Sequence, residues 1–154
     1  MASAAEGRLP RWHVRLLVTS GLALWLSGGG WLLLHYFGQR QGEFGLERSP
    51  LEPWLMRLHG FALLALLLGL GGLFVAHIPR GWGNQGQRLP GLALSAMLAL
   101  LVVSGYLLYY IGADDVRSAT SIVHWAVGLA LPLIFVWHAV KGLRSAARER
   151  SRLE

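Results

Sequence analysis

Histidines are the residues with the widest chemical range in this chain. The sequence of 154 residues contains six of them and no cysteine. Without cysteine, the chain forms no disulfide, holds no thiolate-bound iron–sulfur cluster and builds no cysteine-rich zinc site. Neutral imidazole remains a good ligand for a transition metal. The positions to be explained are His13, His35, His59, His77, His124 and His138.

The elements that must position these histidines are long apolar helices. Hydrophobic residues make up 54% of the chain and charged residues only 14%, whereas a soluble domain is about one quarter charged. Each apolar stretch has the roughly 20 residues that a helix needs to cross the hydrocarbon core. The sequence therefore predicts an all-α integral membrane protein with one domain over residues 1–154, whose helices span about 14–37, 54–78, 89–113 and 118–142.

The distribution of lysine and arginine predicts how these helices are oriented. Ten of the 14 basic residues flank the N-terminus, the loop between the second and third segments, or the C-terminus. Because cytoplasmic loops carry an excess of such residues, we expect an up-down-up-down four-helix bundle with both termini in the cytoplasm. The net charge of +6 then reflects orientation in membrane lipid, and no nucleic-acid partner is expected.

Four histidines lie at similar depths on the second and fourth segments, which this topology makes parallel. His59 and His77 are 18 residues apart, and His124 and His138 are 14 residues apart. At about 100° per residue, both separations keep the two rings of one helix on one face. The outer pair is then His59 with His124, and the inner pair is His77 with His138.

Two imidazoles facing each other across a bundle suit a haem iron, which takes axial ligands on opposite faces. Zinc requires four ligands close together, and proton relays usually include carboxylates, which these segments lack. We therefore expect two haem b groups, each with two histidine ligands and no thioether link. The ligand pair of the inner haem has an alternative, because the two separations do not match in length. The 18 residues from His59 to His77 rise about 27 Å, but the 14 residues from His124 to His138 rise only about 21 Å. His13 could replace His77 as the partner of His138.

Glycines near these histidines fit a flat cofactor. Residues 28–30 are three consecutive glycines in the first segment, and Gly91 and Gly105 are 14 residues apart, like the two histidines of the fourth segment. Glycine permits the close backbone approach that a macrocycle between helices needs. Small residues also serve ordinary helix packing in membranes, so both roles stay open for these positions.

Basic residues near the predicted pairs are candidates to bind anionic haem propionates. Arg57 and Arg117 lie near the outer pair, and Arg80 and Lys141 lie near the inner pair. Each of them could instead serve orientation alone. His35 is expected at the outer interface, close to a quinone or to the propionates.

Several segments resemble the four-helix di-haem cytochrome b superfamily, which includes bacterial cytochrome b561 and the b-type cytochrome subunits of hydrogenases and formate dehydrogenases. The similar segments are RWHVRLLVTSGLALWLSG, RLHGF, LLVVSGYLLYY and SIVHWAVGLALPLIFVWHAVKG. The resemblance implies that His59, His124 and His138 are haem ligands and that His13 is the fourth. The placement of His77 differs from this pattern, since it is more similar to the cytochrome b of quinol–cytochrome c complexes, where two helices carry two ligands each.

The resemblance implies a bacterial inner-membrane protein that carries electrons across the membrane, or between a quinone and a redox partner subunit. The chain shows no flavin motif or glycine-rich nucleotide loop, so we expect an electron-transfer subunit rather than a complete enzyme. Two other classes stay open. One is a membrane anchor, assembly factor or small transporter without a cofactor, and the other is a stand-alone oxidoreductase acting on quinone or superoxide.

Overall fold

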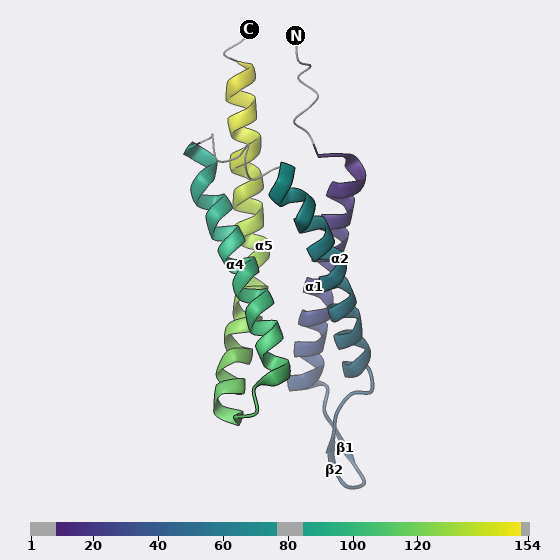
Figure 1. Ribbon diagram of the computed structural model, residues 1–154. Coiled ribbons are helices and arrows are strands. Elements are labelled where there is room, and N and C mark those ends of the chain that lie inside the picture. The colour runs from purple at the N-terminus through teal and green to yellow at the C-terminus, as the bar shows by residue number, and fades with distance from the viewer. Residues whose placement is uncertain (1–8, 77–84, 152–154) are drawn as a thin grey trace. The chain divides into compact units, whose positions relative to one another are not determined.

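The computed structural model describes residues 9–76 and 85–151. These residues form two compact units, each a pair of helices. The first unit holds helix α1 (Arg11–Phe37), strands β1 (Arg40–Gly42) and β2 (Gly45–Glu47), and helix α2 (Glu52–Ala76). The second holds helices α4 (Gln85–Tyr110) and α5 (Asp114–Arg150). Figure 1 shows these elements along the chain.

The first unit is an antiparallel helical hairpin whose connection is itself a small β-hairpin. Strands β1 and β2 pair antiparallel, with Arg40 opposite Glu47. The turn ends at Gly45, whose φ of 119° is one that residues with a side chain rarely adopt. The sequence analysis did not predict these strands, because each has only three residues and periodicity needs a longer run.

The second unit is a tighter hairpin, because only three residues separate α4 from α5. Helix α4 begins at Gln85, about a turn before the predicted start, so Pro90 lies inside the helix. Helix α5 continues through Pro132 to Arg150. Its 37 residues would measure about 55 Å at 1.5 Å per residue, which exceeds the thickness of a hydrocarbon core of about 30 Å.

The predicted helix boundaries differ from the observed ones for local reasons. Helix α5 starts at Asp114 rather than 118, because two acidic residues in its first turn favour the positive end of the helix dipole. Its C-terminal end passes 142 because the segment beyond is rich in alanine, arginine and glutamate, which are strong helix formers. Helix α1 starts directly after Pro10, and α2 starts at Glu52. The predicted end of the second segment at 78 lies outside the described residues.

The burial pattern of the described residues is the reverse of that in a soluble protein. Among them, the buried apolar side chains are Ala62, Leu66 and Pro90, while the buried polar ones are His13, Ser20, Ser27, Glu52 and Ser104. Large apolar side chains on all four helices are exposed. All four helices are long and apolar enough to cross a membrane. A chain with apolar side chains outside and polar ones inside is suited to a lipid environment.

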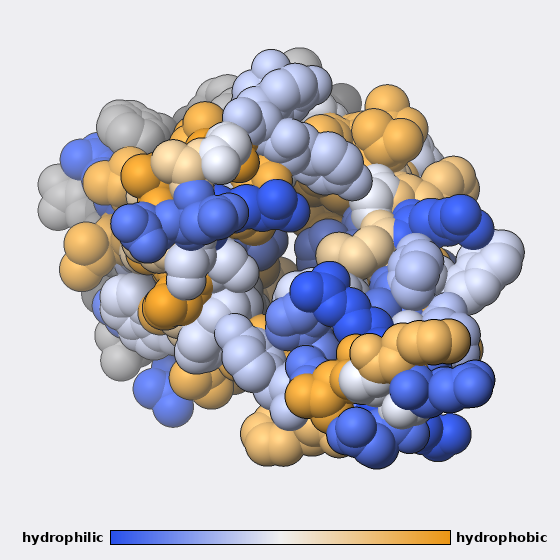
Figure 2. Space-filling model, turned by 90° about the horizontal axis from the view of Figure 1, so that it is seen from below, coloured by the Kyte–Doolittle hydropathy of each residue, from blue (hydrophilic) through white to orange (hydrophobic). Residues whose placement is uncertain are grey.

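Figure 2 views the chain from the end that carries the β1–β2 hairpin. Many hydrophilic side chains gather on this end, mixed with hydrophobic ones. Exposed aromatic residues also lie where helices end, including Phe37 at the end of α1 and Tyr109 and Tyr110 at the end of α4. Polar groups and aromatic residues at helix ends are typical of membrane–water interfaces.

Candidate functional site

His59 of α2 is held by two oxygen atoms of α1. Its Nδ1 lies 3.0 Å from the carbonyl oxygen of Leu24 and 3.1 Å from the hydroxyl of Ser27. A carbonyl oxygen only accepts hydrogen bonds, so Nδ1 of His59 carries the proton and donates it. The next residue of α1 is Gly28, where an added Cβ would lie 3.0 Å from Cε1 of His59. The ring of His59 therefore packs directly on the backbone of α1.

His124 of α5 is held in the same way by α4. Its Nδ1 lies 2.8 Å from the hydroxyl of Ser104. That hydroxyl donates its own hydrogen to the carbonyl oxygen of Leu100 at 2.7 Å, so it accepts the hydrogen from His124. An added Cβ at the following residue, Gly105, would lie 3.2 Å from Cε1 of His124. A serine–glycine pair thus contacts one histidine in each unit.

These hydrogen bonds define the chemical state of both rings. A neutral imidazole that donates from Nδ1 carries its lone pair on Nε2. Metal-binding histidines almost always donate their other ring nitrogen to an oxygen acceptor, which fixes the orientation of the ring and raises the basicity of the ligand. His59 and His124 share the Nδ1 part of this arrangement, since an oxygen atom of the neighbouring helix accepts the Nδ1 hydrogen of each ring.

The other two described candidates also contact glycines of the neighbouring helix. An added Cβ at Gly91 of α4 would lie 3.7 Å from Cε1 of His138. One at Gly72 of α2 would lie 2.5 Å from Cε1 of His13, so no larger residue fits there with the ring in place. His13 is 6% exposed, and its Nε2 lies 2.6 Å from the carbonyl oxygen of Gly69. Binding a metal through Nε2 would require His13 to exchange this hydrogen bond.

Two residues singled out from the sequence, His77 and Arg80, lie outside the described residues. Arg57 stacks on the indole of Trp54, with its guanidinium carbon 4.6 Å from the ring centroid. The ammonium of Lys141 lies 5.2 Å from the ring of Trp137. Arg117 is exposed in the first turn of α5. Arg57 and Arg117 therefore lie in the first two turns of their helices, Lys141 lies inside α5, and the cations of Arg57 and Lys141 rest on aromatic faces.

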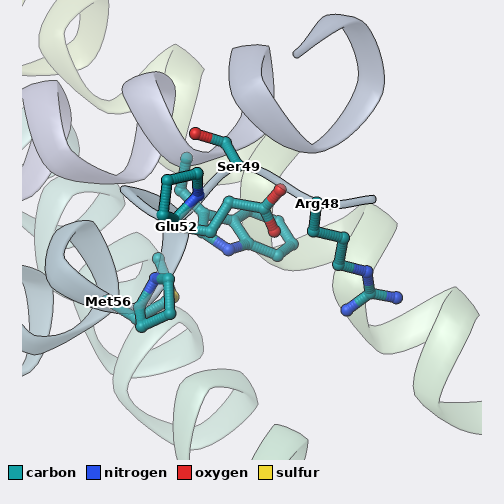
Figure 3. Close-up of a pocket in the computed structure, with 7 residues that line it drawn as sticks. Arg48, Ser49, Glu52 and Met56 are labelled. Atoms are coloured by element: carbon teal, nitrogen blue, oxygen red, sulfur yellow. The ribbon is translucent and has the colours of Figure 1, made fainter. Parts of the chain in front are cut away.

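A second group of polar residues lies at the β-hairpin end of the first unit. Nδ1 of His35 is 3.3 Å from Oε2 of Glu52, which is 5% exposed. The ring of His35 stacks on Trp31, with centroids 4.4 Å apart. A pocket of about 410 Å³ opens beside this group, lined by Trp31, Arg48, Ser49, Pro50, Glu52, Pro53 and Met56. Figure 3 shows the carboxylate of Glu52 at this pocket, with the guanidinium of Arg48 extending away from it.

The sequence analysis missed Ser27, Ser104 and Glu52. The two serines had a signal, because each precedes a glycine in the helix before a candidate histidine. Glu52 had no such signal. Its burial comes from the way the β-hairpin returns the chain to α1, which no local pattern shows.

No protein-family model, curated protein or solved structure matches this chain. The described residues contain no cluster of three or more histidine, cysteine, aspartate or glutamate side chains that could hold a bare metal ion. The histidines of each unit are instead separated along their helices. This spacing is compatible with a role in which each histidine supplies one ligand to a metal that a larger cofactor carries.

Proposed function

We propose that this chain is a di-haem b-type membrane cytochrome that carries electrons across a bacterial inner membrane, or between a quinone and a redox partner. When bound, the haem groups would supply reversible one-electron transfer at their irons. His59 and His124 would bind the outer haem and His138 would bind the inner one. The resemblance of the four segments to di-haem cytochromes b is consistent with these roles.

The observation that carries the proposal is the shared setting of His59 and His124. In both, an oxygen acceptor holds the Nδ1 hydrogen, and a glycine of the neighbouring helix lies against the ring. A structural histidine in an apolar helix needs only one such partner to compensate its burial. The repetition of a complete ligand setting in two separate hairpins favours a common ligand-binding role.

For the inner haem, His138 has two possible partners, and we favour His13. His13 is buried and lies against a glycine of the neighbouring helix, as His59, His124 and His138 do. The Nε2 hydrogen bond to Gly69 shows that this ring already finds a polar partner in its buried position. His77 remains the alternative partner.

The orientation, with both termini in the cytoplasm, belongs to the same proposal. It rests on the excess of lysine and arginine near the termini and between the second and third helices. The chain would act as an electron-transfer subunit, with a quinone or a redox subunit as its partner. Arg57 and Arg80 would lie near the propionates, because guanidinium groups pair well with carboxylates.

The direct test is a reduced-minus-oxidised absorption spectrum of the purified protein, together with haem quantification. We expect a b-type spectrum and two haems per chain after expression with sufficient haem. A colourless protein would contradict the proposal and favour a membrane anchor or transporter. Turnover of quinone or superoxide by the isolated chain would identify a complete oxidoreductase rather than a subunit.

A further inference from the structure

The C-terminal part of helix α5 carries basic residues on one side of the helix. Lys141 and Arg144 are exposed, and Arg148 follows about one turn later. At about 100° per residue, these three positions fall within a sector of about 60°. The sequence of α4 contains no acidic residue, and that of α5 contains none between Asp115 and Glu149. This side of α5 is therefore a positively charged surface of the second unit.

The same side of α5 is apolar in the turns that precede Lys141. Leu133, Trp137 and Val140 are exposed. Together with Lys141 and Arg144, these positions fall within a sector of about 100°. The ammonium of Lys141 lies 5.2 Å from the centre of the Trp137 ring, so the first cation rests against the end of the apolar part. One continuous side of α5 thus changes from hydrophobic to basic at Lys141.

This change falls at the end of the segment of α5 that is long and apolar enough to cross a membrane, since that segment ends at Ser145. Gly91 lies against His138 only six residues after α4 begins, so α5 passes the start of α4 near Arg144. Figure 1 shows α5 continuing beyond that point. When α5 spans a membrane, Lys141 and Arg144 therefore lie at the level of the phospholipid headgroups.

A surface of this composition fits a ligand that is itself amphiphilic. A free phosphate ion would engage only the cations, and an acidic soluble protein would not reach side chains that face hydrocarbon. An anionic phospholipid supplies both a phosphate for the basic residues and acyl chains for the apolar ones. The orientation of a helix needs only the number of basic residues near its end, whereas a lipid site also needs them on one side, next to exposed apolar residues.

We propose that this side of α5 binds an anionic phospholipid. The phosphate of the lipid lies against Lys141 and Arg144, and an acyl chain follows Val140, Trp137 and Leu133 toward the middle of the membrane. The inference requires the helices to lie in a membrane but requires no haem, so it goes beyond the proposed function and does not depend on it.

The first experiment compares two lipids that differ only in their headgroups. Dioleoylphosphatidylglycerol, which is anionic, and dioleoylphosphatidylcholine, which is zwitterionic, are each titrated into the full-length protein in an uncharged detergent. The Kd is taken from the rise in Tm, since a ligand that binds the folded state stabilises it. Each basic residue near a membrane surface contributes about fivefold to the binding of anionic lipid, so we expect phosphatidylglycerol to bind at least about tenfold more tightly.

The second experiment removes the two exposed cations. In the double variant Lys141→Gln with Arg144→Gln, we expect the affinity for phosphatidylglycerol to fall about tenfold to thirtyfold. The matched control is Arg40→Gln with Arg48→Gln, which changes the net charge by the same amount on exposed residues at the β-hairpin end of the first unit. The control should leave the affinity unchanged. Without lipid, both double variants should keep a Tm close to that of the wild type, because all four side chains are exposed.

Four results would overturn the inference. Equal losses of affinity in the two double variants, or none in either, would show that these two cations form no lipid site. Equal binding of phosphatidylcholine would show that the headgroup charge is not recognised. A similar rise in Tm with inorganic phosphate would identify a site for small anions, and no binding of phosphatidylglycerol by the wild type would leave an acidic protein as the partner of the cations. None of these measurements depends on haem, so a colourless protein would contradict the proposed function alone.

Discussion

The two helical hairpins present the same histidine setting but distribute their histidines and glycines differently. In the second hairpin, α5 carries both candidate ligands, His124 and His138, and α4 carries the glycines that face them. In the first hairpin, each helix carries one candidate histidine and one glycine that contacts the histidine of the other helix. His13 of α1 faces Gly72 of α2, and His59 of α2 faces Gly28 of α1.

Both hairpins have the contact between an imidazole ring and a glycine. They differ in which helix carries the histidine and which carries the glycine. An imidazole needs a neighbouring backbone without a side chain, and either helix of an antiparallel hairpin can provide it at a given depth. The first hairpin has a further feature in the Glu52 pocket at its β-hairpin end. The first hairpin therefore combines the contact between histidine and glycine with a pocket beside a buried carboxylate.

The largest expected effect is the loss of a haem from single histidine variants. His59→Ala and His124→Ala should each lower the haem content from two to one per chain, because an outer iron without one axial ligand is bound far less tightly. Haem is quantified as its pyridine complex. His35→Gln is the matched control, since it alters a histidine of α1 outside the proposed ligand set, and it should keep two haems. Full haem content in His59→Ala would break the equivalence of the two hairpins.

The next test asks whether His13 or His77 is the second ligand of the inner haem. We expect His13→Ala to lose the inner haem and His77→Ala to keep it, because the ring of His13 lies against a glycine of the neighbouring helix, as the rings of the other proposed ligands do. Haem content and the spectrum of the remaining haem are compared in the two variants. The reverse result would show that His77, and not His13, is the fourth ligand.

Neighbouring glycines of α2 test whether the close contact is required. At Gly72 an added Cβ would lie 2.5 Å from the ring of His13, while at Gly71 it would meet nothing within 4 Å. Gly72→Ala should destabilise the protein by about 1–3 kcal/mol through overpacking. Gly71→Ala should change stability by less than about 1 kcal/mol. Thermal unfolding of the two variants gives the comparison, and equal Tm values would show that the ring of His13 does not depend on this glycine.

The smallest effect is expected at the serines. The hydroxyl of Ser104 lies 2.8 Å from Nδ1 of His124, whereas the hydroxyl of Ser27 lies 3.1 Å from Nδ1 of His59 and shares that atom with the Leu24 carbonyl at 3.0 Å. Loss of such an acceptor costs roughly 10–100-fold in metal affinity and lowers the basicity of the ligand. We expect Ser104→Ala to weaken haem binding and raise the midpoint potential of the outer haem more than Ser27→Ala does.

A redox titration and a haem-transfer assay measure these two effects of the serine variants. Ser20→Ala is the control, because Ser20 is also a buried serine of α1 and bonds the carbonyl of Leu16. It should leave both the potential and the haem affinity unchanged. A larger effect in Ser27→Ala than in Ser104→Ala would contradict the proposed hydrogen-bond roles.

The four helices could be predicted from the sequence because apolar length alone distinguishes them. The candidate histidines could be predicted from their spacing on those helices. The contacts that prepare them could not, since the serine–glycine pairs act on a histidine 20 to 32 residues away in the chain. Glu52 was missed for the same reason. Its burial depends on a β-hairpin too short to give a periodic signal.

The central claim of the proposed function is that His59 and His124 bind the same iron. The most direct measurement is the haem content of two double variants. If the two histidines share an iron, His59→Ala with His124→Ala should retain one haem per chain, whereas His59→Ala with His138→Ala should retain none. A chain that loses both haems in the first double variant and keeps one in the second would contradict the claim.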